Sequence, residues 1–112
     1  METNNSILIL VVLFLTIYLI YKMFSIKVYR FYSPTCPWCV KSQHEWDRFK
    51  SKCWYRFIKP VDINLNEHGE NLAEKYGVKS VPTVLAIDTT GAVHKYEGDR
   101  SSESYLRWVN KL

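Results

Sequence analysis

Two cysteines separated by two residues carry the clearest chemical signal in this chain. Cys36 and Cys39 lie in the segment SPTCPWCVK, which follows a run of β-forming residues and precedes a helical pattern. A Cys-x-x-Cys pair at the start of a helix can close a small disulfide ring, with the first cysteine at the helix N-terminus. Beside a β-α-β pattern, this spacing indicates dithiol–disulfide chemistry.

Half of a zinc site is the alternative interpretation of the same spacing. Zinc takes four ligands in a structural site. The remaining candidate ligands are Cys53, His44, His68 and His94. Because none of them forms a second Cys-x-x-Cys or a His-x-x-x-His spacing, we expect a redox pair and no metal. We expect Cys53 to be a buried residue at a helix end, since a free cysteine behaves as a small hydrophobe.

A reactive Cys36 needs help to ionise at neutral pH. A free thiol with a pKa near 8.5 is only a few per cent thiolate there. A helix N-terminus contributes about 0.3–1 kcal/mol, or at most about 0.7 of a pKa unit. We therefore expect backbone N–H groups, the Cys39 thiol and cations such as Lys41 to lower the pKa of Cys36 further.

The hydrophobic patterning of the rest of the chain predicts an α/β domain. It indicates the order β-α-β, α, β-hairpin, α over residues 27–32, 37–53, 55–63, 66–76, 83–88, 92–96 and 101–112. A right-handed crossover would make the first two strands parallel. Pro60 lies inside the second strand and cannot donate a ladder hydrogen bond, so this strand is predicted at the sheet edge. Ser101 or Ser102 is expected to cap the last helix.

An apolar segment precedes this domain. Ile7 to Tyr21 holds fifteen residues without a charge, and we expect an anchor that crosses a bilayer through residues 7–24. The chain then divides into a tail and transmembrane anchor, residues 1–25, and a domain, residues 26–112. A cleaved signal peptide is the alternative, but METNNS contains no Lys or Arg and no A-x-A-like cleavage site follows.

The basic residues beside the anchor predict its orientation. Lys22, Lys27 and Arg30 follow the apolar segment, and no basic residue precedes it. The positive-inside rule then places the domain on the cytosolic side of a single-pass membrane protein, where thiols are normally kept reduced. From the cysteine pair and the apolar segment we expect protein dithiol or disulfide substrates, and a lipid bilayer through residues 7–24, as partners. We expect no nucleic acid as a partner.

The motifs of the domain resemble those of the thioredoxin superfamily. CPWC follows a strand, and YGVKSVPT follows some 40 residues later, so that the resemblance covers nearly all of residues 27–112. It implies a thioredoxin-like fold, with a four-stranded mixed sheet and flanking helices, and dithiol–disulfide exchange without a cofactor. It also implies a cis peptide bond between Val81 and Pro82.

The resemblance assigns roles to residues at matching positions. Cys36 would be the attacking thiolate, and Cys39 would resolve the mixed disulfide. Pro82 would pack beside the cysteine pair, and the backbone of Val81 would pair with the substrate chain.

The turn between the cysteines and its surroundings both follow the family and depart from it. Pro37 would keep the turn stiff, and Trp38 would stand at the rim, where it influences the redox potential. Thr35 supports the turn at a position where thioredoxin usually has tryptophan. Arg30 replaces the buried acid that helps to deprotonate the resolving cysteine. Pro37-Trp38 also replaces the Gly-Pro of thioredoxin between the cysteines. This replacement and the positive charge of Arg30, which should stabilise a Cys36 thiolate, predict a reduction potential above that of thioredoxin and a pKa below about 7 for Cys36.

The sequence therefore predicts a membrane-anchored thiol–disulfide oxidoreductase that acts on protein cysteines. Alternatives are a glutaredoxin-like enzyme using glutathione, a redox-inactive binding module with the same fold, and a signal-peptide-bearing oxidase. The double glycine of glutaredoxins is not found in YEGDRSS, which favours the protein dithiol. Small anchored thioredoxins of large DNA viruses are similar, and such an origin would place the chain in a virion or host membrane.

Overall fold

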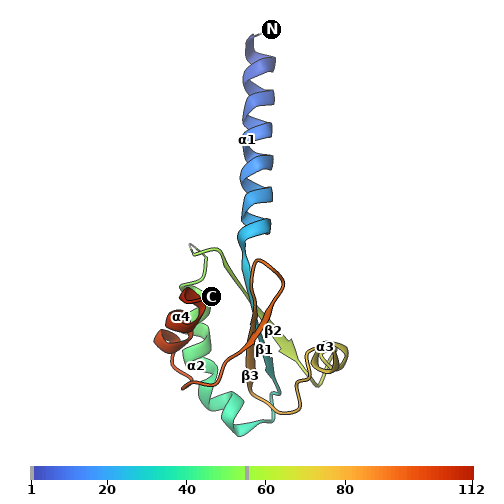
Figure 1. The fold of residues 1–112 in the computed structure, drawn as a ribbon, viewed down its shortest axis with the longest axis vertical. Coiled ribbons are helices and arrows are strands. Elements are labelled where there is room, and N and C mark those ends of the chain that lie inside the picture. The colour runs from blue at the N-terminus through green and yellow to red at the C-terminus, as the bar shows by residue number, and fades with distance from the viewer. Residues whose placement is uncertain (1, 55) are drawn as a thin grey trace.

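The computed structural model describes residues 2–54 and 56–112, and shows a long N-terminal helix joined to an α/β domain (Figure 1). The helix, α1, runs from Glu2 to Phe24. Its segment Asn4–Phe24 is long and apolar enough to cross a membrane, and none of it is buried against the domain. A signal sequence near the N-terminus has the same length and composition, so the anchor and the domain boundary after residue 25 stay predictions.

Four strands form one mixed sheet in the order β2-β1-β3-β4. Their bounds are β1 Ile26–Tyr32, β2 Ile58–Asn64, β3 Thr83–Ile87 and β4 Val93–Lys95. Strands β1 and β2 pair in parallel, and the other two pairs are antiparallel. The fold class is confirmed, and β2 lies at the edge of the sheet, as predicted. Pro60 of β2 is paired with Val28 of β1. At the edge, the N–H that proline lacks is not needed by a further strand.

The helices of the domain cover the two faces of the sheet unequally. Helices α2, Pro37–Ser51, and α4, Ser102–Asn110, lie on one face, and the six-residue helix α3, Glu70–Lys75, lies on the other (Figure 1). The larger core lies beneath α2 and α4. It is built from the buried residues Val28, Trp46, Phe49, Cys53, Ile58, Val84, Ala86, Tyr105, Leu106 and Val109. Helix α2 is therefore fixed against the sheet along its length.

Polar contacts also hold α2 in place. The indole N–H of Trp46 donates to Asp62 on the edge strand β2, and the ammonium of Lys50 lies 2.8 Å from the same carboxylate. On the side of α2 that faces α4, the carboxylate of Glu45 accepts the backbone N–H of Ser102 at 2.9 Å and so caps α4. The side chain of Ser101 is the N-cap of α4, as predicted for one of the two serines.

Several boundaries differ from the sequence prediction, among them those of β2, α3 and α4. Strand β2 begins at Ile58, because Phe57 has a φ of 56° and leaves the extended conformation; Tyr55 lies outside the described residues. The helix predicted over 66–76 is shorter in the structure, where α3 spans Glu70–Lys75. The residues before it form a turn instead, in which the backbone carbonyl of Asn64 accepts two N–H groups. Helix α4 ends at Asn110, so Leu112 is not part of its apolar face.

Candidate active site

The cysteine pair lies where β1 passes into α2. Strand β1 ends at Tyr32, and the next residues turn so that the backbone N–H of Cys36 donates to the carbonyl of Ser33 at 3.1 Å. Cys36 is the N-cap of α2, and Pro37 occupies the first helical position, where a missing N–H costs nothing. The end of α1 and this turn lie at opposite ends of the domain, because β1 runs away from α1 (Figure 1).

The sulfur of Cys36 accepts a hydrogen bond from the backbone at the start of α2. Its Sγ accepts the backbone N–H of Cys39 at 3.3 Å, in place of the oxygen of an ordinary N-cap side chain. The Cys36 side chain is partly exposed, whereas that of Cys39 is buried, and both are free thiols. This arrangement offers one accessible sulfur to a partner and keeps the other behind it.

A segment from the second half of the chain completes the surroundings of Cys36. The Cys36 Sγ lies 3.8 Å from the carbonyl oxygen of Val81, although the two residues are 45 positions apart. The Val81–Pro82 peptide bond is cis, and β3 starts at the next residue, Thr83. The turn before β3 therefore places a backbone carbonyl beside the reactive thiol.

The two thiols are shifted in opposite directions. Hydrogen bonding from the Cys39 thiol lowers the pKa of Cys36, and the backbone N–H groups of Cys39 and Trp38 and the charge of Arg100 lower it further. Burial raises the pKa of Cys39, and its hydrogen bond to Cys36 raises it too. Cys36 is therefore the thiol that ionises first, which is the state needed for attack on a disulfide.

Arg30 lies behind the pair and is fully buried. Its Nη2 donates to the carbonyl oxygen of Cys39 at 2.8 Å and to Ser42 at 3.1 Å, and its Nη1 donates to Gln43 at 2.9 Å. None of the ion pairs formed by the described side chains includes Arg30. The guanidinium thus acts on α2 through neutral acceptors, and its charge lowers the pKa of Cys39.

This geometry corrects the expected role of Arg30. The sequence prediction assigned its charge to the Cys36 thiolate, whereas the cation that lowers the pKa of Cys36 is Arg100. Arg100 belongs to the segment before α4 and was not predicted, because nothing in its local sequence links it to the cysteines.

Trp38 stands at the rim of the site, with 59% of its surface exposed. The ammonium of Lys41 lies 5.0 Å from the centre of its ring, and the guanidinium of Arg100 lies 6.0 Å from it. Both distances suit cation–π interactions. Lys41, predicted to act on Cys36, is instead placed on the Trp38 ring.

The remaining predicted residues have simpler surroundings. Thr35 is exposed, and its hydroxyl lies 3.0 Å from that of Ser33 in the turn before Cys36. Cys53 is buried beyond the end of α2, where its thiol donates to the carbonyl of Phe49 and burial raises its pKa to about 12. The described side chains contain no group of three potential metal ligands.

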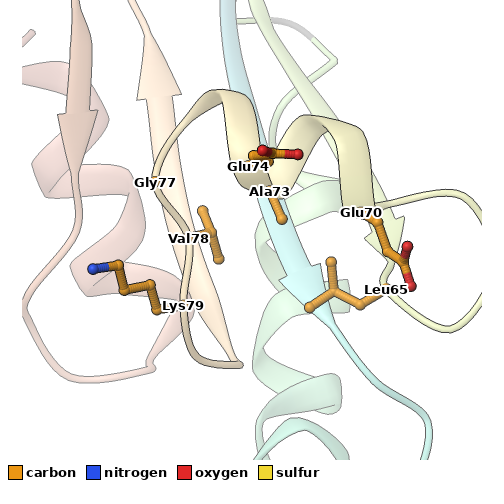
Figure 2. Close-up of a pocket in the computed structure, with 7 residues that line it drawn as sticks. All are labelled: Leu65, Glu70, Ala73, Glu74, Gly77, Val78 and Lys79. Atoms are coloured by element: carbon orange, nitrogen blue, oxygen red, sulfur yellow. The ribbon is translucent and has the colours of Figure 1, made fainter.

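Two cavities of the domain are lined by residues other than the cysteine pair. A cavity of about 520 Å³ lies between α3 and the loop that leads to β3, lined by residues including Leu65, Ala73 and Val78 (Figure 2). A smaller one of about 280 Å³ touches Pro82 and Tyr96.

Comparison with known families decides where this chain belongs. A family model described as thioredoxin matches residues 20–111. The chain belongs to the thioredoxin family. The match includes the cysteine pair, the Val81–Pro82 turn and the last turn of α1.

Similar proteins and structures agree with this assignment. The thioredoxin domain is 35% identical over 85 residues to protein disulfide isomerase-like 2-2 of Oryza sativa subsp. japonica, covering 71% of this chain and 22% of that protein. It is 29% identical over 89 residues to protein disulfide-isomerase of Medicago sativa, covering 75% and 17%. The chain therefore spans about a fifth of the length of these relatives.

Solved thioredoxin domains superpose on it. The J-Trx1 fragment of ERdj5 has a TM-score of 0.68 and 27% identity, over 78% of this chain and 41% of that one. The first thioredoxin domain of mouse protein disulfide-isomerase A4 has a TM-score of 0.67 and 25% identity, over 78% and 62%.

Proposed function

We propose that this chain is a membrane-anchored thiol–disulfide oxidoreductase that acts on protein cysteines through Cys36 and Cys39. The observation that carries the proposal is the Cys36 sulfur itself. It caps α2, accepts the Cys39 N–H and lies beside the Val81 carbonyl. The relatives of this chain include proteins named protein disulfide isomerases, which supports disulfide exchange as the reaction.

The reaction proceeds by two thiolate attacks. The Cys36 thiolate attacks one sulfur of a substrate disulfide, the substrate S–S bond breaks, and the other substrate cysteine leaves as a thiolate that takes up a proton. Cys39 then loses its proton and attacks the Cys36 sulfur, which releases the second substrate thiol and closes the Cys36–Cys39 disulfide. Two electrons pass from the protein dithiol to the substrate, and the reverse sequence oxidises a substrate dithiol.

The surroundings of Cys36 orient the substrate chain. The Val81 backbone beside the thiol offers main-chain hydrogen bonds to an extended substrate segment, and Pro82 lies next to it. Trp38 provides an exposed aromatic surface at the cysteine turn. Pro37 and Thr35 hold that turn in the conformation that exposes the Cys36 sulfur.

The anchor and its orientation form the second half of the proposal. Segment Asn4–Phe24 has 21 residues, which gives a helix of about 31 Å and matches a hydrocarbon core of about 30 Å. Lys22 and Lys27 flank its domain end and are exposed. By the positive-inside rule these charges place the domain on the cytosolic side.

Cysteine variants of the full chain test the chemistry. Cys36→Ser should abolish reduction of a protein disulfide, because no attacking thiolate remains. Cys39→Ser should trap a mixed disulfide between Cys36 and the substrate, visible on a non-reducing gel. Cys53→Ser is the matched control, because its buried thiol lies outside the site, and it should keep turnover. Full activity of Cys36→Ser would refute the assignment.

Membrane association is tested separately. The chain should stay with membranes after alkaline extraction, which removes peripheral proteins. A membrane-impermeant thiol reagent added to intact cells should leave Cys36 unlabelled if the domain faces the cytosol. Rapid labelling of the reduced protein would reverse the orientation and leave the chemistry unaffected.

A further inference from the structure

The loop between α2 and β2 lies at the end of the domain that carries α1 (Figure 1). The backbone N–H of Ile26, the first residue of β1, donates to the carbonyl of Phe57 at 2.9 Å. The Phe57 ring lies 5.6 Å from the ring of Tyr21 in the last turn of α1. The loop is therefore attached directly to the end of the apolar helix.

Two aromatic side chains of this loop are exposed. Trp54 has 77% of its surface exposed, and Phe57 has 47%. Phe57 also has a φ of 56°, a left-handed conformation that is rare for a large side chain, so the backbone is strained where it directs this ring towards α1. Neither ring contributes to the core of the domain. Tryptophan and other aromatic residues are typical of membrane–water interfaces.

Basic residues surround the same end of the sheet. Lys27 and Lys59 are directly opposite each other in the parallel pair of β1 and β2, an arrangement in which like charges repel. Both line a cavity of about 380 Å³ together with Lys22. Asp88 shares a neighbouring cavity with Lys22 and Lys27, but its carboxylate is engaged in its own turn and by His94. An external anion would relieve the repulsion of the two lysines.

The dimensions of α1 place these residues at the depth of lipid headgroups. When the 21 residues of Asn4–Phe24 cross a core of about 30 Å, Phe24 lies at its boundary. The headgroup layer beyond is about 5–8 Å thick. Lys27 is three residues further along the chain, within about 10 Å by strand geometry, and Phe57 lies beside Tyr21, closer still.

We infer that Lys27, Trp54, Phe57 and Lys59, the membrane-side pole of the domain, contact an anionic lipid leaflet. The inference rests on the anchoring part of the proposed function. The aromatic rings enter the headgroup layer, and the lysines bind lipid phosphates or carboxylates. This second contact fixes the tilt of the domain on its anchor.

The consequence for function is a fixed height of the active site. Strand β1 runs from the membrane-side pole to the turn before Cys36, and its seven residues span about 20 Å. Cys36 therefore faces away from the bilayer. Substrates meet it about that distance from the membrane-side pole, on partners that extend from the membrane or in solution.

Tryptophan quenching in vesicles tests the inference on the full chain. The protein is reconstituted into vesicles of phosphatidylcholine and phosphatidylserine, with bromine atoms on the phosphatidylcholine acyl chains near the headgroup. Trp54→Phe should lose most of the quenching of tryptophan fluorescence. The matched control is Trp38→Phe, which removes the exposed tryptophan at the opposite end of the domain and should keep the quenching of the wild type. Far-UV circular dichroism of both variants, and turnover of Trp54→Phe, report that the domain is folded.

Charge and lipid composition provide a second readout. Lys27→Gln combined with Lys59→Gln should lose the quenching that depends on phosphatidylserine, as should wild type in vesicles of phosphatidylcholine alone. Equal quenching of wild type and Trp54→Phe would overturn the inference. If the protein is extracted from the vesicles by alkali, the anchor itself is refuted; if it stays inserted while Trp54 is unquenched, only the membrane-side pole is refuted.

Discussion

Replacing Arg30 with methionine tests how this site manages the proton of Cys39. The guanidinium is fully buried and donates to the Cys39 carbonyl at 2.8 Å. The thioredoxin resemblance predicts an acid at this position, which would accept the proton of the resolving cysteine. A cation accepts no proton, so Arg30 acts by stabilising the Cys39 thiolate. Arg30→Met removes the charge and keeps an unbranched side chain of similar reach.

The size of the effect follows from the distance between the two groups. Covalent geometry keeps the Cys39 sulfur within about 5 Å of its own carbonyl oxygen. Adding the hydrogen bond of 2.8 Å places the guanidinium nitrogen within about 8 Å of the sulfur. Two unit charges about 8 Å apart interact by about 2 kcal/mol at an effective dielectric constant of about 20. Burial is the strongest influence on the pKa of Cys39 and raises it, whereas the charge of Arg30 lowers it. We therefore expect Arg30→Met to raise the pKa of Cys39 further.

The resolving step converts this shift into a rate. Loss of about 1.4–2 kcal/mol of charge interaction lowers the thiolate fraction at neutral pH by about 10- to 30-fold. Greater nucleophilicity recovers part of the loss with a Brønsted coefficient of about 0.4–0.5. The attack of Cys39 on the mixed disulfide should then be about three- to sevenfold slower. Above the pKa of Cys39 in both proteins, the slowing should disappear, since each thiol is fully ionised. Arg30→Met should then react the faster, because its Cys39 thiolate is the more nucleophilic.

Stopped-flow reaction with a chromogenic aryl disulfide measures this step. The first coloured thiolate is released when Cys36 attacks, and the second when Cys39 closes the ring. Arg30→Lys is the control, because it retains the charge and should stay closer to the wild type. Slowing of the second phase by the same factor at every pH would mean that Cys39 is displaced and not harder to ionise. An unchanged second phase in Arg30→Met would refute the reasoning.

Three further outcomes are expected. Equilibration with glutathione should give a potential above the value of about −270 mV for thioredoxin, and Arg100→Gln should lower it, because Arg100 favours the Cys36 thiolate of the reduced form. Cys53→Ala should lose about 1–2 kcal/mol of unfolding free energy in urea through the cavity it leaves without slowing turnover, since the thiol is buried; slowed turnover would give it a role in the site. Hydrogen bonds from Thr90 and His94 lower the pKa of Asp88, so its contribution to stability is complete above about pH 4 and is lost as the pH falls towards the lowered pKa. Thermal unfolding of Asp88→Asn should lack that part of the acid destabilisation, and an unchanged pH profile would contradict it.

The sequence by itself determined the elements that depend on local pattern. The uncharged run after Ile7 forms a helix along its whole length, because every backbone group is satisfied within the segment. The strand before Ser33 and the helix that begins at Pro37 place the cysteine pair at a helix N-terminus. Pro60 marked the sheet edge, since proline lacks the N–H that an inner strand requires.

Boundaries were less predictable where a tertiary contact overrode a local preference. Phe57 alternates with Val61 and Ile63 in the sequence, yet it lies outside β2 because its carbonyl binds the first residue of β1 and its ring packs on α1. Helix α3 is shorter than its periodicity predicted, because Asn64 satisfies the backbone of the preceding turn.

The family resemblance placed Val81 and Pro82 near the cysteine pair, but only the tertiary structure decided the distances and charges around the Cys36 sulfur. Val81 and Arg100 are far from Cys36 along the chain, and they reach it because the β3 and α4 segments pack beside α2. Arg30 was visible as a departure from the family pattern, but its burial and its bonds to Cys39, Ser42 and Gln43 depend on how α2 lies across the sheet. Hydrogen bonds and Coulomb interactions depend on distance in space, and separations along the chain do not fix that distance until the core has packed.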